Sequence, residues 1–340
     1  MVSGLLDTLP AAQRDLLGPA APGDELATPP MLAVLSDRRV FGADWLFERK
    51  LDGVRALGAR HEDRTRLLSR TGRAMQTTYP EIIDALSAQE CRDFTVDGEI
   101  VAYARGRTDF ALLQRRMQIT DAARARASGV AVTYYLFDLL RLDGYDLTRL
   151  PLRTRKSLLR RAVAFRAPLR FTPHRNEGGQ EQLDAACARG WEGLIAKRAG
   201  GRYVRRRSPD WLKLKCARGQ EFVVGGFTEP AGAGGRIGFG ALLVGTYEEG
   251  RLRYAGKVGT GFDRATLVGL RGTLDGLAAP HSPFADRVRE PRPHWVRPEL
   301  VAQVAFTEWT RDGMLRHPRF LGLRDDKRPE QVVREEPEPG

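Results

Sequence analysis

One stretch organises the interpretation of this chain, and it runs Phe47-Glu48-Arg49-Lys50-Leu51-Asp52-Gly53-Val54-Arg55. It places a lysine directly after an apolar run and just before an Asp-Gly pair. Asp-Gly is typical of a tight turn and the apolar run indicates a strand, so the backbone around the lysine is held on both sides. This arrangement suits a nucleophilic amine, whereas a solvated hairpin lysine is the ordinary alternative for so short a pattern.

The scarcity of lysine relative to arginine favours a nucleophilic Lys50 over a solvated hairpin lysine. Only seven of the 55 lysines and arginines are lysines, so arginine is used wherever a positive charge alone is needed. Arginine keeps its proton in proteins, whereas lysine can become a neutral nucleophile or act as a compact charge beside a phosphate. Each lysine is therefore a candidate for chemistry: Lys50, Lys156, Lys197, Lys213, Lys215, Lys257 and Lys327.

Length, charge and cysteine content limit the class of protein. A chain of 340 residues with 42% hydrophobic residues is long enough for two domains with sizeable cores. A net charge of +12 favours a polyanionic partner such as nucleic acid, although a generally basic soluble surface carries the same charge. Cys91, Cys187 and Cys216 are isolated, which predicts neither a zinc site nor a disulfide and suits a reducing cytoplasm. No stretch has the pattern of a membrane span or a secretory leader, so we expect no membrane partner.

The pattern of elements divides the chain into four segments. Residues 1–27 are expected to form an extension that docks loosely or acts as a linker, because prolines interrupt its apolar pattern. Residues 28–217 mix strands and helices, residues 218–330 contain short strands with one helix, and residues 331–340 form a flexible tail. The third segment is typical of a small OB-type barrel, in which the glycine-rich residues 232–238 form a hairpin rather than a phosphate loop.

Apolar periodicity and turn residues give the boundaries of the individual elements. Helices are expected at 79–86, 152–163, 180–189 and 263–277. Strands are expected at 54–59, 65–69, 94–103, 130–140, 191–197, 211–215, 222–227, 241–247, 252–258 and 300–309.

Several polar and aromatic residues in these elements are candidates for a site. Glu99 lies within an apolar strand, which is costly unless an arginine or a cation partners it. Phe137 either faces a base or belongs to the core, and Lys213 and Lys215 lie on one face of their strand. The basic face of the helix at 152–163, which includes Lys156, either touches phosphates or is solvated.

Taken in order, these segments resemble the covalent nucleotidyltransferases, and specifically the ATP-dependent DNA ligases. The similarity covers about residues 30–330, and a segment at 306–318 resembles the ligase module of bacterial non-homologous end joining. Arg205 departs from the pattern, since a glycine is expected there. The motifs that carry the resemblance are Glu48–Arg55, Ser69–Gly72, Asp97–Glu99, Tyr135–Asp138, Glu192–Lys197, Trp211–Lys215 and Arg324–Lys327.

The resemblance implies an α+β fold, with an adenylation (nucleotidyltransferase) domain of antiparallel sheets and helices followed by a C-terminal OB-fold β-barrel. It also implies a reaction in which Lys50 attacks the α-phosphate of ATP and the AMP then passes to a DNA 5′-phosphate. Crowding by the other lysines and a metal ion is expected to favour proton loss from Lys50. The implied partner is nicked or broken double-stranded DNA at the nucleoid, joined by a monomer that acts with or without separate end-binding and repair polymerase proteins.

The same resemblance implies a role for each site residue. Glu99 and Glu192 would hold Mg²⁺ or Mn²⁺, Phe137 would stack on adenine, and Glu48 would accept a hydrogen bond from the adenine amine. The remaining contacts to ATP would come from Arg55, Arg70, Lys197, Lys213 and Lys215. Arg324 and Lys327 would orient the pyrophosphate when the second domain closes on a hinge near Ala217-Arg218-Gly219. DNA would contact the basic loop that contains Arg202, Arg205, Arg206 and Arg207.

Three other classes remain as alternatives. An RNA ligase or a capping-type guanylyltransferase shares the lysine chemistry, although Glu48 favours adenine. A catalytically silent DNA-binding scaffold is disfavoured by the acids and lysines present at every motif. An NAD-dependent ligase is disfavoured because its zinc cysteines and additional DNA-binding domains have no counterpart in the sequence.

Overall fold

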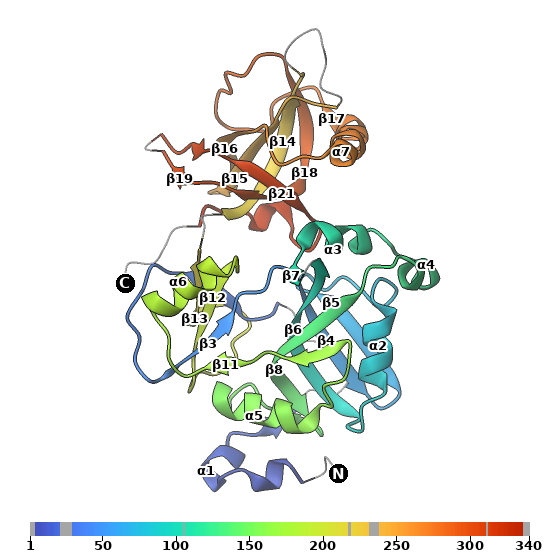
Figure 1. The fold of residues 1–340 in the computed structure, drawn as a ribbon, viewed down its shortest axis with the longest axis vertical. Helices are drawn as coiled ribbons and strands as arrows, with labels where there is room; N and C mark the ends of the chain where they lie inside the picture. Colours follow the sequence, from blue (N-terminus) through green and yellow to red (C-terminus); the bar gives the residue numbers. More distant parts are fainter. Residues whose placement is uncertain are drawn as a thin grey trace. The chain divides into compact units, whose positions relative to one another are not determined.

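The fold consists of two compact units, with the division after Cys216. The computed structural model describes residues 4–20, 29–104, 106–216, 219–230, 238–310 and 312–335 (Figure 1). Ala217 and Arg218 of the expected hinge, and most of the glycine-rich stretch at 232–238, lie outside the described residues. Each unit is described by itself below.

The first unit is built around a large sheet whose main path has the order β1-β9-β8-β6-β4-β5. All pairings along this path are antiparallel, and β10 joins the side of β8 in parallel. The strands are β1 (Gly18–Pro19), β4 (Val54–His61), β5 (Arg64–Ser69), β6 (Asp93–Ala104), β7 (Arg107–Thr108), β8 (Val132–Leu142), β9 (Tyr145–Asp146) and β10 (Leu169–Phe171).

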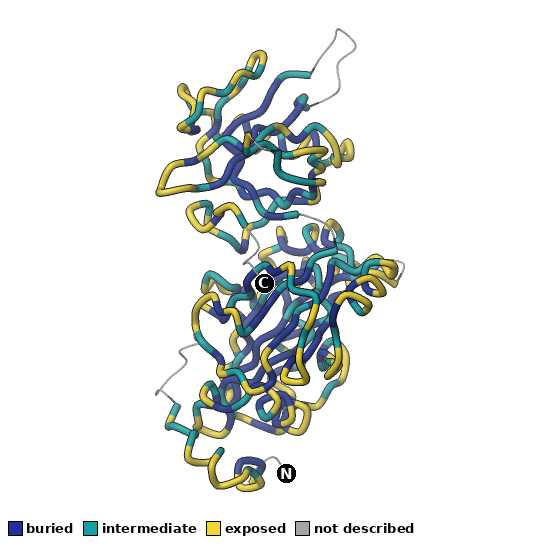
Figure 2. The backbone as a smooth tube through the Cα atoms, turned by 90° about the vertical axis from the view of Figure 1, so that its left-hand side faces the viewer, coloured by how far each residue is buried: buried dark blue, intermediate teal, exposed yellow. Residues whose placement is uncertain are grey.

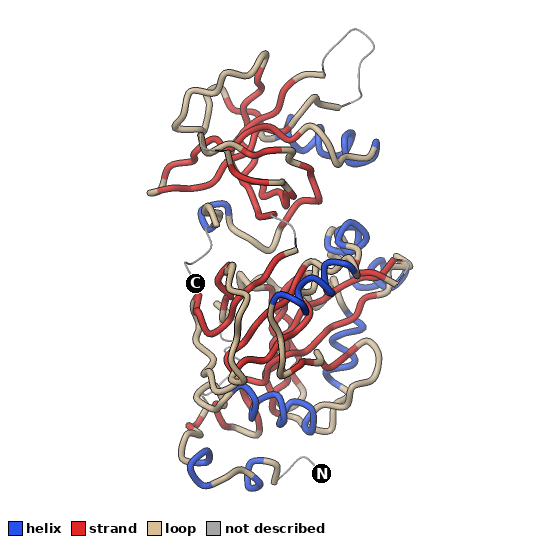
Figure 3. Tube along the Cα trace, turned by 60° about the vertical axis from the view of Figure 1, so that its left-hand side comes forward, coloured by secondary structure: helices blue, strands red, loops and turns tan. Residues whose placement is uncertain are grey.

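Helices pack on this sheet and enclose the main core of the first unit. They are α2 (Pro80–Ser87), α3 (Phe110–Met117), α4 (Ala122–Ala127) and α5 (Leu152–Ala162). Ile82 from α2, Leu113 from α3 and Leu159 from α5 are all fully buried in the same cluster as the strand residues. Figure 2 shows that the buried segments follow the strands, and Figure 3 shows the helices outside them.

A second, smaller sheet of the first unit has the order β11-β3-β12-β13-β2. One face is covered by α6 (Gln180–Ala188), whose Leu183 packs in a cluster with Phe47, Leu194 and Leu212. Since side chains alternate along a strand, the neighbouring residues of the same strands lie on the opposite face. The strands are β2 (Leu32–Leu35), β3 (Trp45–Arg49), β11 (His174–Arg175), β12 (Gly193–Arg198) and β13 (Arg207–Lys215).

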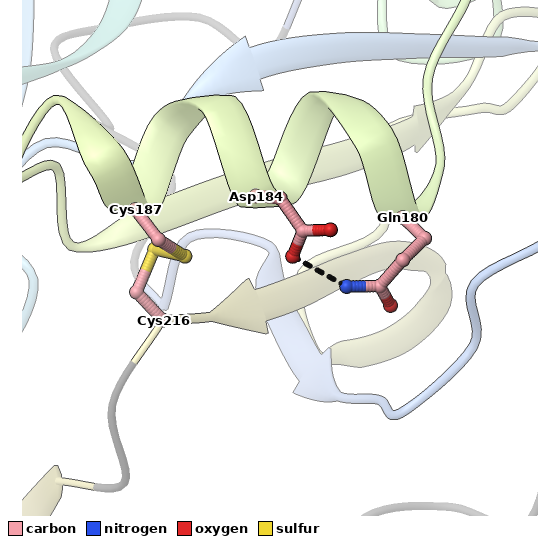
Figure 4. Close-up of a disulfide and its surroundings, with 4 residues drawn as sticks. All are labelled: Gln180, Asp184, Cys187 and Cys216. Carbon is pink, nitrogen blue, oxygen red and sulfur yellow. Dashed lines mark hydrogen bonds between the residues drawn. A yellow bond between two sulfur atoms is a disulfide. The ribbon is translucent and has the colours of Figure 1, made fainter.

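A disulfide joins Cys187, near the end of α6, to Cys216, directly after β13 (Figure 4). The sulfur atoms are 2.13 Å apart and the Cα atoms 5.3 Å apart. The expectation that the isolated cysteines form no disulfide is therefore wrong. The two residues are 29 positions apart in sequence, and only the packing of α6 on the small sheet brings them together. Cys91 is buried with a free thiol.

The N-terminal segment is docked onto the first unit more firmly than the sequence suggested. It contains a 3₁₀ turn (Leu6–Thr8), α1 (Ala11–Arg14) and β1, which pairs with β9. Leu5 and Leu6 are buried in the main core. The hydroxyl of Thr154 on α5 donates a hydrogen bond to Gln13 over 2.9 Å.

The second unit is a strongly curved sheet of the OB type, as predicted. The order β16-β15-β14-β18-β17 is extended by β21, which also pairs with β18, and α7 (Arg264–Gly276) matches the expected helix. The strands are β14 (Gly219–Thr228), β15 (Leu242–Glu248), β16 (Arg251–Val258), β17 (Ala278–Ala279), β18 (Pro293–Ala305) and β21 (Arg319–Arg324), with a hairpin of β19 (Glu308–Trp309) and β20 (Leu315–Arg316).

Two expectations for the second unit need correction. The strand expected at 300–309 is divided, because β18 ends at Ala305 and Glu308 begins the separate β19 hairpin. The expected flexible tail begins too early: Val332 is fully buried, and the amide of Glu335 donates to the side chain of Gln220. Among the helices that the structure describes, none combines the length and apolar character needed to cross a lipid bilayer.

Candidate active site

Lys50 lies immediately after β3, at the edge of the face of the small sheet that is opposite α6. Its amide donates to the carbonyl of Gly193 over 2.9 Å, which fixes its backbone to β12. Its ammonium forms an ion pair with Glu192, and the Lys50 side chain is 19% exposed. The lysine is therefore held by backbone contacts, and its side chain remains partly exposed.

The charge state of Lys50 differs from the expectation. Burial disfavours its ammonium, but the carboxylate of Glu192, with smaller contributions from Asp52 and Glu99, outweighs that effect and raises the pKa. The nearby carboxylates thus raise the pKa of Lys50, where crowding by other lysines was expected to lower it. In particular, Lys197 points its ammonium toward Glu48.

The turn after Lys50 packs directly against the strand that carries Glu99. A Cβ atom on Gly53 would lie 2.2 Å from the carbonyl oxygen of Ile100 and 3.0 Å from the Glu99 side chain. Only glycine permits that approach. The Asp-Gly pair therefore brings the lysine and the acid strand β6 together, which explains why Glu99 acts on Lys50 electrostatically.

A buried group of three charges lies beside Lys50 on the same side of the small sheet. Glu48 receives the ammonium of Lys156 at 2.5 Å on one carboxylate oxygen and that of Lys197 at 2.7 Å on the other. All three side chains are 2% exposed or less. The expectation that Lys156 touches phosphates or is solvated is therefore wrong, because α5 turns it into the interior.

The charges of this group influence one another. Burial opposes the ionisation of Glu48, yet the two lysines outweigh burial and lower its pKa. Burial lowers the pKa of Lys197 to about 8, because Glu48, which opposes that effect, is shared with Lys156. The group therefore carries more positive than negative charge in a protected position.

Phe137 lies on β8 within reach of this group. It is 7% exposed and packs with Trp211, Tyr203 and Met31. The Lys197 ammonium is 4.1 Å from the centroid of its ring. Phe137 is thus largely a core residue whose ring also borders the charged group, and stacking on adenine stays a prediction.

Arg55 is held by protein contacts. Its guanidinium donates two hydrogen bonds to Asp97, over 2.5 and 2.6 Å, and a third to the carbonyl of Met31. Tyr203 donates to the same Asp97 over 2.7 Å, and its hydroxyl accepts from the amide of Met31. This network joins the large sheet to the entry of β2, and the predicted contact of Arg55 with nucleotide is not tested by it.

The remaining predicted residues of the first unit lie on β13, in the turn after β5 and in the basic segment 202–207. Lys213 and Lys215 lie on β13 opposite Ile195 and Gly193, on the same face as Glu48 and Lys197. Arg70 lies in the turn after β5, closed by a hydrogen bond from Gly72 to Ser69. The predicted DNA-contacting residues are all exposed, and they are Arg202, Arg205, Arg206 and Arg207.

Arg324 and Lys327 belong to the second unit, where each has a carboxylate partner. Arg324 donates two hydrogen bonds to Asp326, and Lys327 pairs with Glu221 at 2.9 Å. Their expected role with pyrophosphate stays a prediction. Lys257, to which no role was given, forms an ion pair with Glu290 on the surface of the second unit.

Comparison with known families matches both units. Residues 30–215 match the family model described as ATP dependent DNA ligase domain, which covers more than half of the chain. Residues 235–327 match the model described as ATP dependent DNA ligase C terminal region.

The chain belongs to the ATP-dependent DNA ligase family.

Curated relatives from two bacteria refine this assignment. The chain is 39% identical over 336 residues to the multifunctional non-homologous end joining protein LigD of Pseudomonas aeruginosa. It is 37% identical over 305 residues to the LigD protein of Mycobacterium tuberculosis. The alignments cover 96% and 86% of this chain but only 39% and 38% of those relatives, so the chain spans about two fifths of their length.

A solved structure supports the same assignment. The mycobacterial DNA ligase D complexed with ATP and MES aligns with a TM-score of 0.63 and 34% identity. The alignment covers 91% of this chain and 98% of that one. The predicted fold of a nucleotidyltransferase domain followed by an OB-fold domain, and the predicted resemblance to the end-joining ligases, are confirmed.

Two residues near Glu48 were missed in the assignment of roles. Lys156 was recognisable as one of seven scarce lysines, but its position on a basic helix face suggested the surface. His174 lies directly opposite Glu48 in the ladder between β11 and β3. Its Nδ1 is buried and has no hydrogen-bond partner among the described residues, and burial together with Lys156 lowers its pKa. No sequence signal marked His174.

Proposed function

We propose that this chain uses ATP to form a lysyl-adenylate on Lys50 and then seals nicks or broken ends in double-stranded DNA. The observation that carries the proposal is the ion pair of Lys50 with Glu192 beside the face of the small sheet opposite α6, where Lys213 and Lys215 also lie. One nucleophilic amine among phosphate-binding lysines is the arrangement that nucleotidyl transfer requires.

The first step joins the Nζ atom of Lys50 to the α-phosphorus of ATP. Lys50 reacts as the neutral amine, after the proton of its ammonium has passed to its partner Glu192 or to solvent. The new phosphorus–nitrogen bond replaces the bond to the bridging oxygen, and pyrophosphate leaves with that oxygen and its electron pair. Lys213 and Lys215 would hold the α-phosphate in line with Lys50. Glu48 and Phe137 would bind the base, with Arg55 and Arg70 nearer the ribose and phosphates.

Glu99 and Glu192 are the carboxylates that would hold a divalent cation, since Glu192 pairs with the Lys50 ammonium and Glu99 acts on the same ammonium electrostatically. Within the described residues no group of three potential metal ligands occurs. Magnesium or manganese commonly takes one or two carboxylates and completes its shell with phosphate oxygens and water. A bound ion would supply positive charge to the phosphates of the nucleotide.

The second and third steps would use DNA. The AMP passes from Lys50 to a 5′-phosphate, and the 3′-hydroxyl of the neighbouring nucleotide then displaces it, forming the phosphodiester bond and releasing AMP. The exposed arginines between Arg202 and Arg207, together with the net charge of +12, suit contact with the phosphate backbone.

The biological setting is also part of the proposal. The names of the LigD relatives assign those proteins to non-homologous end joining, and the chain matches about two fifths of their length. We infer that this chain supplies the ligation step of bacterial end joining at the nucleoid, acting as a monomer beside end-binding and repair polymerase functions. Broken DNA ends with short overhangs are the substrate to compare with simple nicks.

Mass spectrometry of the purified protein with ATP and magnesium tests the first step. We expect one added AMP on Lys50, removed by pyrophosphate, and a much smaller yield with GTP. Lys50→Ala should carry no adduct and seal no nicked DNA. Lys257→Ala, which removes an exposed lysine of the second unit, should behave as the wild type. An adduct retained by Lys50→Ala, or no adduct on the wild type, would reject the proposal.

A further inference from the structure

Three acceptors hold the ammonium of Lys156 in one position. An ammonium group has three donors. Those of Lys156 face Glu48 at 2.5 Å, the carbonyl of Thr172 at 3.1 Å and the carbonyl of Phe137 at 3.5 Å. These acceptors come from β3, from the segment after β10 and from β8. The side chain is 1% exposed, so no water competes for its position.

The consequence of this contact falls on Glu48. With Lys156 on one oxygen and Lys197 on the other, the carboxylate cannot rotate without breaking an ion pair. A carboxylate offers about four acceptor positions, so Glu48 keeps the capacity for a further donor. Its orientation is fixed while its ability to bind a ligand amine remains.

Stability alone does not account for such a group. Burying three charges has a large desolvation cost, and apolar residues of similar volume often stabilise a fold equally well. The helix that supplies Lys156 otherwise uses arginine for its positive charges. A compact ammonium is therefore retained at the one position of α5 that contacts Glu48.

We propose that Lys156 is a positioning residue that fixes Glu48 for recognition of the base, and that it thereby sets the preference for ATP over GTP. This inference rests on the proposed function, in which Glu48 accepts a hydrogen bond from the exocyclic amine of adenine. Guanine presents a carbonyl oxygen at the same place, and a carboxylate that cannot turn away repels it. Without Lys156, the Glu48 carboxylate can rotate away from guanine, and the site discriminates less between ATP and GTP.

The test uses Lys156→Met, which keeps the length of the side chain and removes its charge. The rate of lysyl-nucleotide formation is measured by mass spectrometry against the concentration of ATP and, separately, of GTP. We expect KM for ATP to rise about tenfold and the preference for ATP over GTP to fall by at least about tenfold, the effect of one charge-assisted hydrogen bond. The kcat with ATP should change less than KM, because Lys156 does not touch the phosphates.

Further variants separate positioning from folding. Arg160→Met removes an exposed charge from the same helix and should leave both parameters unchanged. If Lys156→Met does not fold, Glu48→Gln/Lys156→Met removes the stranded carboxylate as well. This double variant should fold and show the same preference as Glu48→Gln alone, because Lys156 acts only through Glu48. Lys156→Arg, which restores charge, should recover part of the preference.

The outcomes distinguish this inference from the proposed function. A wild type that forms no adduct with ATP overturns both. A wild type that forms the adduct, beside a folded Lys156→Met with unchanged KM and nucleotide preference, overturns the role of Lys156 alone. A double variant whose preference differs from that of Glu48→Gln alone overturns it as well. A fall in kcat with KM and preference unchanged would likewise assign Lys156 to another role and overturn this one.

Discussion

At the scale of single residues, the site depends on how carboxylates are divided among lysines. Lys50 is paired with Glu192, while Lys197 and Lys156 share Glu48. Lys50, which has a carboxylate of its own, keeps its proton more firmly, whereas burial lowers the pKa of Lys197, which shares its carboxylate with Lys156. The structure therefore contains two lysine environments of opposite electrostatic character a few residues apart in the sheet.

Lys197 makes stability depend on pH. Its pKa is about 8 in the folded protein and 10.5 ordinarily, so the unfolded chain binds more protons between these values. The contribution of Lys197 to the free energy of unfolding should therefore increase as the pH rises from about 8 to about 10.5. In urea denaturation, the wild type should gain stability relative to Lys197→Met between about pH 7.5 and about pH 9.5.

A suitable control for this experiment is Lys257→Met, which removes one charge from the surface of the second unit. Its difference from the wild type should not follow the pattern of Lys197→Met. If the difference between wild type and Lys197→Met stays constant or shrinks over the same interval, the lowered pKa of Lys197 is wrong.

The sequence predicts the positions of residues next to the Asp-Gly turn better than the contacts of residues that are distant in the sequence. Lys50 was predictable because the strand and the Asp-Gly turn that hold it are its own neighbours. Its pairing with Glu192 was not, since the acid comes from the start of another strand, 142 positions later. Lys156 and Arg155 were misplaced for a related reason: adjacent charged residues on a helix normally face solvent, and only tertiary partners can turn both inward.

At the scale of elements, α5 is tied to β8 by a fully buried ion pair. Arg155 donates to Asp138 over 2.7 and 2.9 Å, and neither side chain is exposed. A further hydrogen bond from Arg155 reaches the carbonyl of Gly201. The pair thus holds the helix that carries Lys156 against the strand that carries Phe137.

Removing one partner of this pair should be costly. Arg155→Met leaves Asp138 as an uncompensated buried charge, which typically lowers the free energy of unfolding by about 3–5 kcal/mol. Urea denaturation measures this loss. Arg153→Met, at an exposed position of the same helix, should change stability by no more than about 0.5 kcal/mol. Equal effects of the two substitutions would contradict the importance of the buried pair.

Long periodic elements were predictable, and short ones were not. The helix expected at 152–163 is α5 within one residue, and the i and i+2 spacing of Lys213 and Lys215 does place both on one face of β13. The short α3 and α4 were missed because eight and six residues are too few to show a helical period. Their starts are set instead by the capping side chains of Asp109 and Asp121.

At the scale of the whole molecule, each unit has a hydrophobic core of its own. The main core of the first unit lies between the large sheet and its helices, and that of the second unit includes Phe222, Leu242 and Leu274. Separate cores allow separate unfolding transitions. The disulfide lies in the first unit, so its effect on stability should be confined there.

Reduction of the disulfide should destabilise the first unit alone. Closing a loop across 29 residues contributes roughly 3 kcal/mol by restricting the unfolded chain, which corresponds to a fall in Tm of roughly 5–10 °C. Differential scanning calorimetry with and without a phosphine reductant measures the shift. Cys187→Ser should already have the lower Tm and be insensitive to reductant. A reductant shift that persists in this variant would contradict the assignment.

This disulfide also marks the limit of inference from cysteine spacing. Isolated cysteines were taken as free thiols because no short-range pair was present. Cys187 and Cys216 meet because α6 covers the small sheet and β13 ends beneath its last turn (Figure 4). That meeting is a property of the tertiary fold, which no local pattern contains.

The place of Cys216 has a mechanical consequence. It is the last residue of the first unit, so any pull that the second unit exerts through the connecting chain arrives there first. Without the bond to Cys187, such a load would open the hydrogen bonds between β13 and β12 one after another, starting at Lys215. With the bond in place, part of the load passes to α6, and the strand that carries Lys213 and Lys215 bears less of it.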